Sequence, residues 1–352
     1  MKILVIGGSG FIGPFIIGEL VRQGHEVTLV HRGHAKPVLP ESVQRIPTDR
    51  NNLRVHRKMF ERLAADAVID VILSDERQAK DLMENFRGVT GHIVALSSQD
   101  VYRAYGVLLG SEPGLPQPTP LTEESEVRTK LRPYKPEQMR MVRAAFSWIT
   151  DDYDKIPVER TVLNDPQLPG TVVRLPMVYG PGDPLHRLFP IIKRIVDGRP
   201  AILLEAKYGS LRLPRGYVEN VAAAVALAAT SPKAAGRIYN IATQEQFSEL
   251  EWAQKIGQAM GWKGAVISVP KDQAPEHIQT SMNTDQDWVV SSTRIREELG
   301  FVDPVPLDGA LARTIEWERA NPPAVNPAQF DYAAEDALLE QLRSQGAGSE
   351  MI

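Results

Sequence analysis

The hydrophobic pattern of the first hundred residues alternates between short apolar segments and longer segments with helical periodicity. Strands that would be buried in a parallel sheet are predicted at 3–6, 26–30, 44–46, 67–73 and 92–96. Between them, apolar positions recur every three or four residues after position 11, over 53–64 and over 75–86. Strands that alternate with helices in this way predict an α/β fold with a doubly wound parallel sheet and right-handed crossovers.

The pattern beyond residue 105 is less regular. Residues 106–140 combine clustered glycines and prolines with a charged stretch, which predicts a long surface excursion over the active site, with a lid as one option. Further strands are predicted at 170–175, 201–204, 209–213, 237–241 and 266–269. Further helices are predicted at 185–196, 221–229, 247–260, 292–299 and 307–320. We therefore expect a sheet domain over 1–180, a smaller C-terminal α/β lobe over 181–330, and a C-terminal helix with a tail over 331–352.

A glycine turn joins the first predicted strand to the first predicted helix. Its sequence is GGSGFIG, with Gly7, Gly10 and Gly13 three residues apart. Such glycines permit a tight turn, a close approach of backbone to a pyrophosphate, and tight packing of the helix on the sheet. The N-terminus of the helix would offer free N–H groups and a positive dipole end to the anion. We interpret the turn as a dinucleotide-binding turn rather than as one without a ligand.

Three stretches carry a family resemblance that covers roughly residues 1–320. The glycine turn, SSQDVY at 97–102 and RLPMVYGPGDP at 174–184 resemble the extended short-chain dehydrogenase/reductase superfamily, which includes NAD-dependent epimerases and dehydratases. The resemblance implies a Rossmann-type dinucleotide-binding domain over 1–180 and a substrate-binding lobe over 181–330. It also implies cofactor contacts at Gly7, Ser9, Gly10, Phe11, Ile12 and Gly13.

Residues at the ends of later strands bear on the choice of cofactor. Arg32 follows the second strand, where an arginine can pair with a 2′-phosphate, so we expect NADP, with NAD as the alternative. A solvated arginine is the other interpretation. Asp49 lies where resembling proteins place an acidic residue near the adenine, although an exposed turn aspartate is equally compatible. We also expect Ser74 at the cofactor, together with Pro176 in the loop that resembles the one beneath the nicotinamide.

The expected catalytic residues depart from the superfamily's pattern. By resemblance, Ser98 would hydrogen-bond the reacting oxygen, while a tyrosine exchanges a proton with substrate and a lysine four residues later lowers its pKa. Tyr153 stands at the tyrosine's place, but Pro157 occupies the fourth position and the available lysine is Lys155. Because a proline deep in a helix would break it, we expect Asp154 to cap a helix that begins after Tyr153.

Two classes of function follow from these residues. The first is an NAD(P)-dependent epimerase, dehydratase or reductase that moves hydride between nicotinamide and a nucleotide-sugar-like small molecule. In such an enzyme, Arg215 would clamp a phosphate or carboxylate of the substrate, although a surface ion pair is the other interpretation. The second class is a catalytically silent dinucleotide-binding regulator or an RNA-binding relative. Although the altered tyrosine–lysine spacing favours the second class, we favour the enzyme.

Composition narrows the choice further. The chain has 352 residues, a net charge of −4 and no cysteine, which excludes disulfides, cysteine nucleophiles and thiolate metal sites. The negative charge counts against nucleic acid as a partner. The seven histidines show no paired spacing that indicates a metal site. No apolar run approaches the roughly 18 to 20 residues that span a bilayer. We expect a cytoplasmic protein without a membrane partner, with a homodimer as one option.

Overall fold

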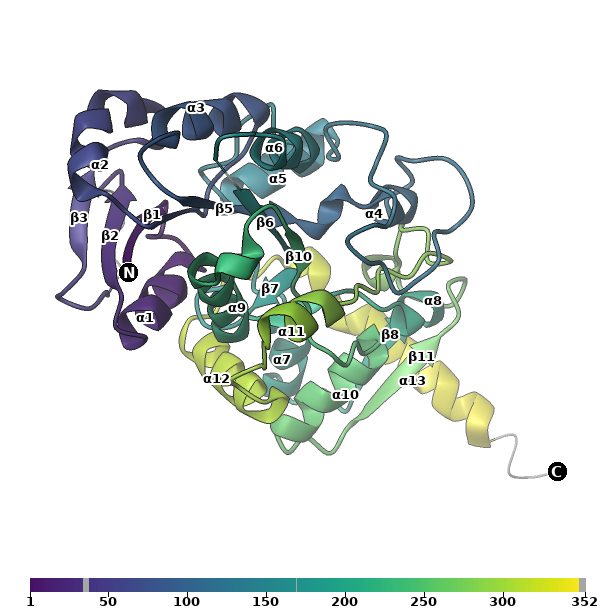
Figure 1. The fold of residues 1–352 in the computed structure, drawn as a ribbon. Helices are drawn as coiled ribbons and strands as arrows, with labels where there is room; N and C mark the ends of the chain where they lie inside the picture. Colours follow the sequence, from purple (N-terminus) through teal and green to yellow (C-terminus); the bar gives the residue numbers. More distant parts are fainter. Residues whose placement is uncertain (34–37, 169, 348–352) are drawn as a thin grey trace.

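The computed structural model describes residues 1–33, 38–168 and 170–347. Its centre is a parallel sheet of seven strands in the order β10-β6-β5-β4-β1-β2-β3 (Figure 1). These strands are β1 (Lys2–Ile6), β2 (Glu26–His31), β3 (Gln44–Pro47), β4 (Ala67–Asp70), β5 (His92–Ser98), β6 (Gly170–Leu175) and β10 (Ile238–Asn240). The chain begins at β1, runs outward to β3, and then crosses back to β4 and proceeds the other way. The sheet is therefore doubly wound, and its order reverses between β1 and β4.

Helices cover both faces of this sheet. α1 (Gly13–Arg22) and α9 (Val218–Thr230) pack on one face, and α2 (Arg57–Leu63), α3 (Glu76–Phe86) and α6 (Lys155–Leu163) on the other. The same part of the chain also contains α4 (Arg103–Leu108), α5 (Pro136–Ala145) and 3-10 turns at 50–56 and 99–101. Alternate residues of β1 enter two separate cores. Ile3 and Val5 pack with residues of α1 and α9, whereas Leu4 and Ile6 pack with residues of α2, α3 and α6. Burial on both faces explains why β1 is a continuous apolar run.

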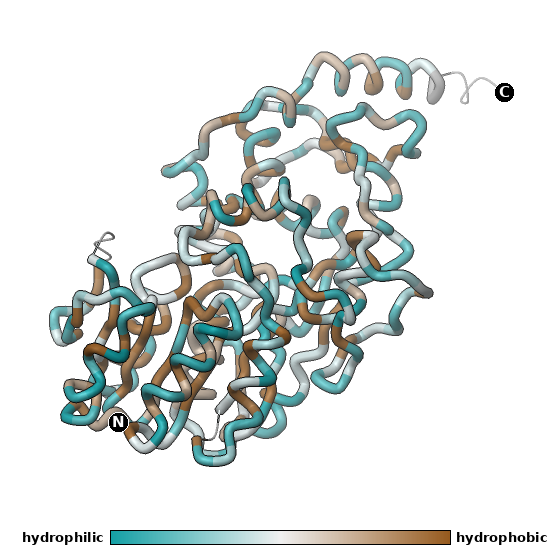
Figure 2. Tube along the Cα trace, turned by 90° about the horizontal axis from the view of Figure 1, so that it is seen from above, coloured by the Kyte–Doolittle hydropathy of each residue, from teal (hydrophilic) through white to brown (hydrophobic). Residues whose placement is uncertain are grey.

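The C-terminal lobe is built from two short pairs of strands and six helices within the described residues. β7 (Met177–Tyr179) pairs with β9 (Arg215–Tyr217), and β8 (Ala201–Glu205) pairs with β11 (Ala265–Val269), both in parallel. The helices are α7 (Phe189–Val196), α8 (Ala206–Ser210), α10 (Glu249–Ala259), α11 (Thr293–Leu299), α12 (Leu307–Ala320) and α13 (Tyr332–Ala347), with 3-10 turns at 232–234, 276–278 and 327–329. In the part of the chain that the structure describes, no helix is long and apolar enough to cross a membrane. Figure 2 shows α13 projecting at the end of the molecule opposite the sheet domain.

Two elements lie elsewhere than the sequence suggested. β10 and α9 fall in the range expected for the lobe, but β10 pairs with β6 in the central sheet and α9 packs on α1.

Residues 209–213 were expected to form a strand, and this prediction is wrong, because α8 extends to Ser210. The partner of β8 is instead β11, about sixty residues further along the chain, which local periodicity does not reveal.

The start of α6 agrees with the expected geometry. Asp154 caps the helix, and its side chain accepts a hydrogen bond from the Ile156 amide at 2.9 Å. Pro157 falls in the first turn, where its missing N–H removes no helical hydrogen bond. Tyr153 therefore lies outside α6, and Lys155 is the first residue of α6.

Candidate functional site

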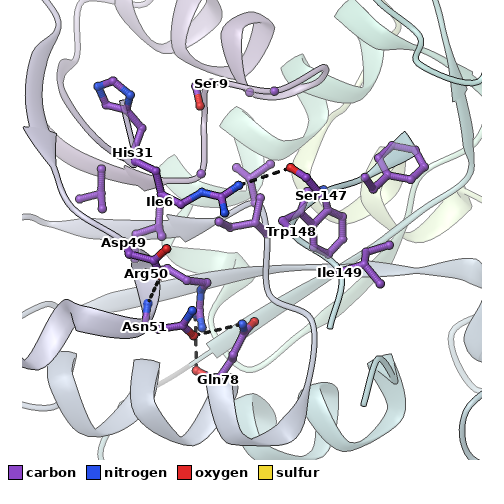
Figure 3. Close-up of a pocket in the computed structure, with 18 of the residues that line it drawn as sticks. Ile6, Ser9, His31, Asp49, Arg50, Asn51, Gln78, Ser147, Trp148 and Ile149 are labelled. Carbon is purple, nitrogen blue, oxygen red and sulfur yellow. Dashed lines mark hydrogen bonds between the residues drawn. The ribbon is translucent and has the colours of Figure 1, made fainter. Parts of the chain in front are cut away.

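A cavity of about 530 Å³ lies at the carboxyl edge of the sheet, where the strand order reverses (Figure 3). Its walls are the glycine turn, the ends of β2 and β3, the segment after β4, and residues 143–151. Ligands of doubly wound sheets bind at this switch point, because the loops on its two sides diverge there. The cavity thus coincides with the place at which a dinucleotide is expected.

The three glycines of the turn have three different surroundings. Gly7 has a φ of +81°, a conformation that favours glycine, and Gly13 lies so close to the backbone of Gly8 that a Cβ would overlap it. A Cβ on Gly10 would meet no atom within 4 Å, and Gly10 lines the cavity. In the described part of the chain, no side chain caps α1 at Ile12. An open helix N-terminus beside unfilled space fits the pyrophosphate of a dinucleotide.

The residues expected at the adenosine end also line this cavity. The Arg32 guanidinium donates to the Ser147 hydroxyl at 3.3 Å and pairs with no carboxylate among the described residues. Asp49 caps the 3-10 turn at 50–56, and its carboxylate accepts from the Asn51 amide at 2.8 Å. Arg32 is therefore available to an anion, whereas part of the hydrogen-bonding capacity of Asp49 is used within the turn.

Ser74 and Pro176 do not line the cavity. The Ser74 hydroxyl accepts a hydrogen bond from the Thr150 amide at 2.9 Å, and the Ser74 carbonyl accepts one from the Asp154 amide at 3.1 Å. Ser74 thus attaches residues 150–154 to the end of β4. Pro176 is buried between β6 and β7, where a Cβ on Gly216 would lie 2.8 Å from its ring. Ser74 thus lies behind the Thr150 wall of the cavity, and Pro176 is held in the packing between β7 and β9.

A second group of side chains gathers at the end of β5. The Tyr153 hydroxyl donates to Oδ2 of Asp100 at 2.9 Å, and the Tyr134 hydroxyl donates to the same oxygen at 3.0 Å. Ser98 accepts from the Asp100 amide at 3.2 Å. Burial raises the pKa of Asp100, which is 1% exposed, and burial also raises the pKa of Tyr153 well above its usual value. Oδ1 of Asp100 has no partner among the described residues.

Asp100 is a functional candidate that the sequence did not indicate, and Tyr134 is the alternative tyrosine of the excursion, which, like Tyr153, has no lysine four residues later. Asp100 follows Ser98 by two residues at the carboxyl end of a buried strand, which is a signal that could have identified it. Tyr134 comes from the excursion, and only the fold brings it to Asp100. The excursion therefore contributes a side chain to this cluster.

Lys155 lies beside the same cluster. Its Nζ donates to the carbonyl oxygens of Leu73 and, at 2.9 Å, Leu96, so it bridges the ends of β4 and β5. Burial lowers the pKa of Lys155 to about 8, against the opposing effect of nearby Asp100. Nζ is 5.1 Å from the centre of the Trp148 ring, and Trp148 lines the first cavity. Lys155 thus lies behind that wall of the cavity.

Arg215 borders a second cavity, of about 370 Å³, in the C-terminal lobe. Its guanidinium donates to the two carboxylate oxygens of Glu249 at 2.6 and 2.9 Å. Both side chains are buried, so this ion pair is not at the surface. Arg215 therefore borders a cavity in the expected substrate lobe, with its charge already paired.

Comparison with known sequences shows the same family along most of the chain. Residues 3–242 match the NAD dependent epimerase/dehydratase family. The UDP-glucose 4-epimerase of Lactobacillus helveticus is 26% identical over 342 residues, which cover 92% of this chain and 98% of that protein. The 2′-dehydrokanamycin reductase of Streptomyces kanamyceticus is 24% identical over 312 residues, which cover 86% and 78%. These relatives are similar over most of their own length.

Solved structures share the fold. An epimerase from Methanothermobacter thermautotrophicus superimposes with a TM-score of 0.64 at 18% identity, covering 91% of this chain and 92% of that one. The UDP-glucose 4-epimerase of Thermus thermophilus, in complex with NAD, superimposes with a TM-score of 0.59 at 19% identity, covering 91% and 100%. With the sequence match over residues 3–242, the chain belongs to the NAD-dependent epimerase/dehydratase family.

Proposed function

We propose that this protein transfers hydride, with NAD(P), at a hydroxyl- or carbonyl-bearing carbon of a sugar-like small molecule. The observation that carries the proposal is the open α1 N-terminus at the switch-point cavity. The hydroxyl and carboxyl groups at the end of β5 do not line this cavity but lie behind its Trp148 wall, with the Tyr153 ring centre 6.5 Å from that of Trp148. One relative is named for UDP-glucose and another for dehydrokanamycin, and both names support a sugar-like substrate. A substrate that is a nucleotide sugar would also carry a diphosphate.

The side chains at the end of β5 have complementary roles in this proposal. A bound nicotinamide supplies the hydride donor or acceptor. The Ser98 oxygen accepts from the Asp100 amide, so its hydroxyl hydrogen can be donated to a substrate oxygen or to the neighbouring Tyr153 hydroxyl, whose pKa Ser98 lowers against the larger effect of burial. Tyr153 exchanges a proton with that oxygen, and Asp100, which accepts from the Tyr153 hydroxyl, is placed to take the proton onward. Tyr153 and Asp100 thus form a proton relay, and the positive charge of Lys155 stabilises negative charge on these two groups.

The cofactor that we propose is NADP, with NAD as the alternative. Arg32 lines the cavity beside the end of β2 and has no carboxylate partner in the described residues, as recognition of a 2′-phosphate requires. Asp49 is proposed to lie near the adenine, at the end of β3.

Tyr153→Phe tests the proposed chemistry, because it removes one hydroxyl and little else. We expect loss of turnover with unchanged dinucleotide affinity, measured by product analysis and by titration of the cofactor. Tyr332→Phe, on the C-terminal helix α13, is the matched control and should keep turnover. Wild-type turnover in Tyr153→Phe would remove this tyrosine from the reaction.

The alternative of a catalytically silent regulator or an RNA-binding protein predicts a different result. Such a protein would bind the dinucleotide but would convert no sugar-like compound in a substrate panel. Neither relative named above is described as a regulator or as an RNA-binding protein.

A further inference from the structure

The second cavity, in the C-terminal lobe, has a charge distribution that limits its ligand. It lies between α7, β8 and α10, next to residues 277–280. Three arginines line it, namely Arg187, Arg194 and Arg215. Three cations around one cavity suggest a site for a phosphate group, until the partner of each arginine is considered.

Each of the three arginines is bound to a buried carboxylate. Arg215 donates twice to Glu249, at 2.6 and 2.9 Å. Arg194 donates twice to Glu335 of α13, at 3.1 and 2.7 Å. Arg187 donates to Asp183 at 2.7 Å. The exposed fractions of Glu249, Glu335 and Asp183 are 8%, 0% and 1%. Each of the three guanidinium groups thus contacts a buried carboxylate, and Glu335 also contacts His277 of the cavity wall at 3.0 Å and lies 4.0 Å from Arg199.

Several further hydrogen bonds hold these side chains in place, although Nε of Arg215 and Nε1 of Trp252 have no partner among the described residues. Arg194 donates to the carbonyls of Pro190 and Gln329, at 3.0 and 3.1 Å. Arg187 donates to the Val178 carbonyl at 2.8 Å. Glu249 accepts, besides Arg215, the hydroxyl of Tyr208 at 3.2 Å. A ligand anion could meet the unpartnered Nε of Arg215, but it could gain a full guanidinium charge only by displacing a carboxylate of the protein.

The helix N-termini that border the cavity are closed as well. At α7, the Phe189 amide donates to the His186 carbonyl at 2.9 Å, Pro190 has no N–H, and the Ile191 amide donates to the Leu188 carbonyl at 3.2 Å. At α10, Ser248 and Glu251 form a reciprocal capping box. At α1, by contrast, the Gly13 amide has no partner among the described residues, although Pro14 lacks an N–H and the Phe15 amide donates to the Ile12 carbonyl at 3.2 Å.

These contacts make a diphosphate an unfavourable occupant. The two negative charges of a diphosphate diester need compensation inside a partly enclosed cavity. An arginine that turned to the phosphate would leave a buried carboxylate unpaired, which is strongly destabilising. The neutral part of the wall, in contrast, includes the aromatic rings of Trp252 and Tyr208 and apolar side chains of α7 and β8. Such walls suit a ligand with an apolar face and a few hydroxyl groups.

We propose that this second cavity is a substrate site for an uncharged, hydroxyl-bearing ring such as a glycoside, and that it excludes nucleoside diphosphate sugars. The proposal rests on the proposed function, since it takes the lobe cavity as the substrate side of the enzyme. It narrows that function to substrates without a diphosphate. Arg215 then serves as an ion-paired wall of the cavity rather than as an open phosphate clamp.

Direct binding to the full-length protein tests the proposal without any need for turnover. Phenyl β-D-glucopyranoside and UDP-glucose are titrated calorimetrically, in the absence of dinucleotide and again at saturating NADP. We expect the glycoside to bind with an affinity at least about tenfold higher than that of UDP-glucose. Trp252→Leu should weaken glycoside binding and leave NADP binding unchanged, which locates the site in the lobe. Stronger binding of UDP-glucose, or no binding of the glycoside, would overturn the proposal.

Variants that release an arginine provide a gain-of-function test. Glu249→Gln and Glu335→Gln each remove one compensating charge, and each should raise the affinity for UDP-glucose at least about tenfold. Glu298→Gln is the matched control, because Glu298 on α11 pairs with Arg237, away from the cavity, and should leave this affinity unchanged. No gain in either cavity variant, with NADP binding intact as evidence of folding, would refute the charge argument. A wild-type protein that binds no dinucleotide would instead refute the proposed function.

Discussion

The buried ammonium group of Lys155 leads to a prediction about stability as well as about catalysis. Lys155 is 3% exposed and donates to the carbonyls of Leu73 and Leu96. Its pKa in the folded protein is lowered to about 8 by burial, whereas an ordinary lysine titrates near 10.5. The unfolded chain therefore holds this proton more tightly than the folded one, and the charged lysine costs folding free energy at neutral pH.

The size of this cost follows from the difference between the two pKa values. Each pH unit between them is worth about 1.4 kcal/mol, so the full cost below pH 8 is about 3 kcal/mol. The cost decreases as the pH rises through the folded-state pKa and disappears above about 10.5. Between pH 7 and pH 9, the contribution of Lys155 to the free energy of unfolding should therefore rise by about 1 kcal/mol.

Lys155→Met removes the titrating group while nearly conserving the side-chain volume. Urea unfolding of the wild type and the variant at pH 7, 8 and 9 gives the difference in stability at each pH. We expect the wild type to gain about 1 kcal/mol relative to Lys155→Met across this range. Lys58→Met is the matched control, since Lys58 is exposed on α2, and its difference from wild type should not change with pH. Parallel pH dependence of Lys155→Met and wild type would show that the amine is not held in a buried position.

Three further substitutions test the cofactor cavity and the cluster at the end of β5. Gly10→Val should abolish dinucleotide binding in a titration without lowering the melting temperature, because its Cβ enters open space; unchanged affinity would place the pyrophosphate elsewhere. Arg32→Ala should weaken NADP more than NAD, and equal losses would show that Arg32 does not contact the 2′-phosphate. Asp100→Asn should lower turnover by about 10²-fold or more. It should also remove the loss of activity on acidification that a buried carboxylate with a raised pKa produces; an unaltered pH–rate profile would exclude Asp100 from the relay.

Much of the fold followed from local pattern. The apolar run of β1 and the helical spacing of α1 are properties of neighbouring residues, because a strand repeats every two residues and a helix every 3.6. The glycine turn was predictable for the same reason: a strand, a turn and a helix N-terminus lie within some twenty residues. The capped start of α6 followed from Asp154 and Pro157, since capping and the missing proline N–H act within one helical turn.

The composition of the two cavities was decided by contacts between residues far apart in the chain. Tyr134 reaches Asp100 across 34 residues, and Arg215 meets Glu249 across another 34. Arg194 meets Glu335 across 141 residues. In the sequence, an arginine at position 215 is compatible with either an open anion site or an ion pair, because its chemistry depends on which carboxylate the fold brings within hydrogen-bonding distance. The sequence by itself determined the dinucleotide fold, because strand and helix patterns are local. Only the tertiary structure decided which charged groups remain free to meet a ligand, because charge compensation depends on which residues the packed fold brings together.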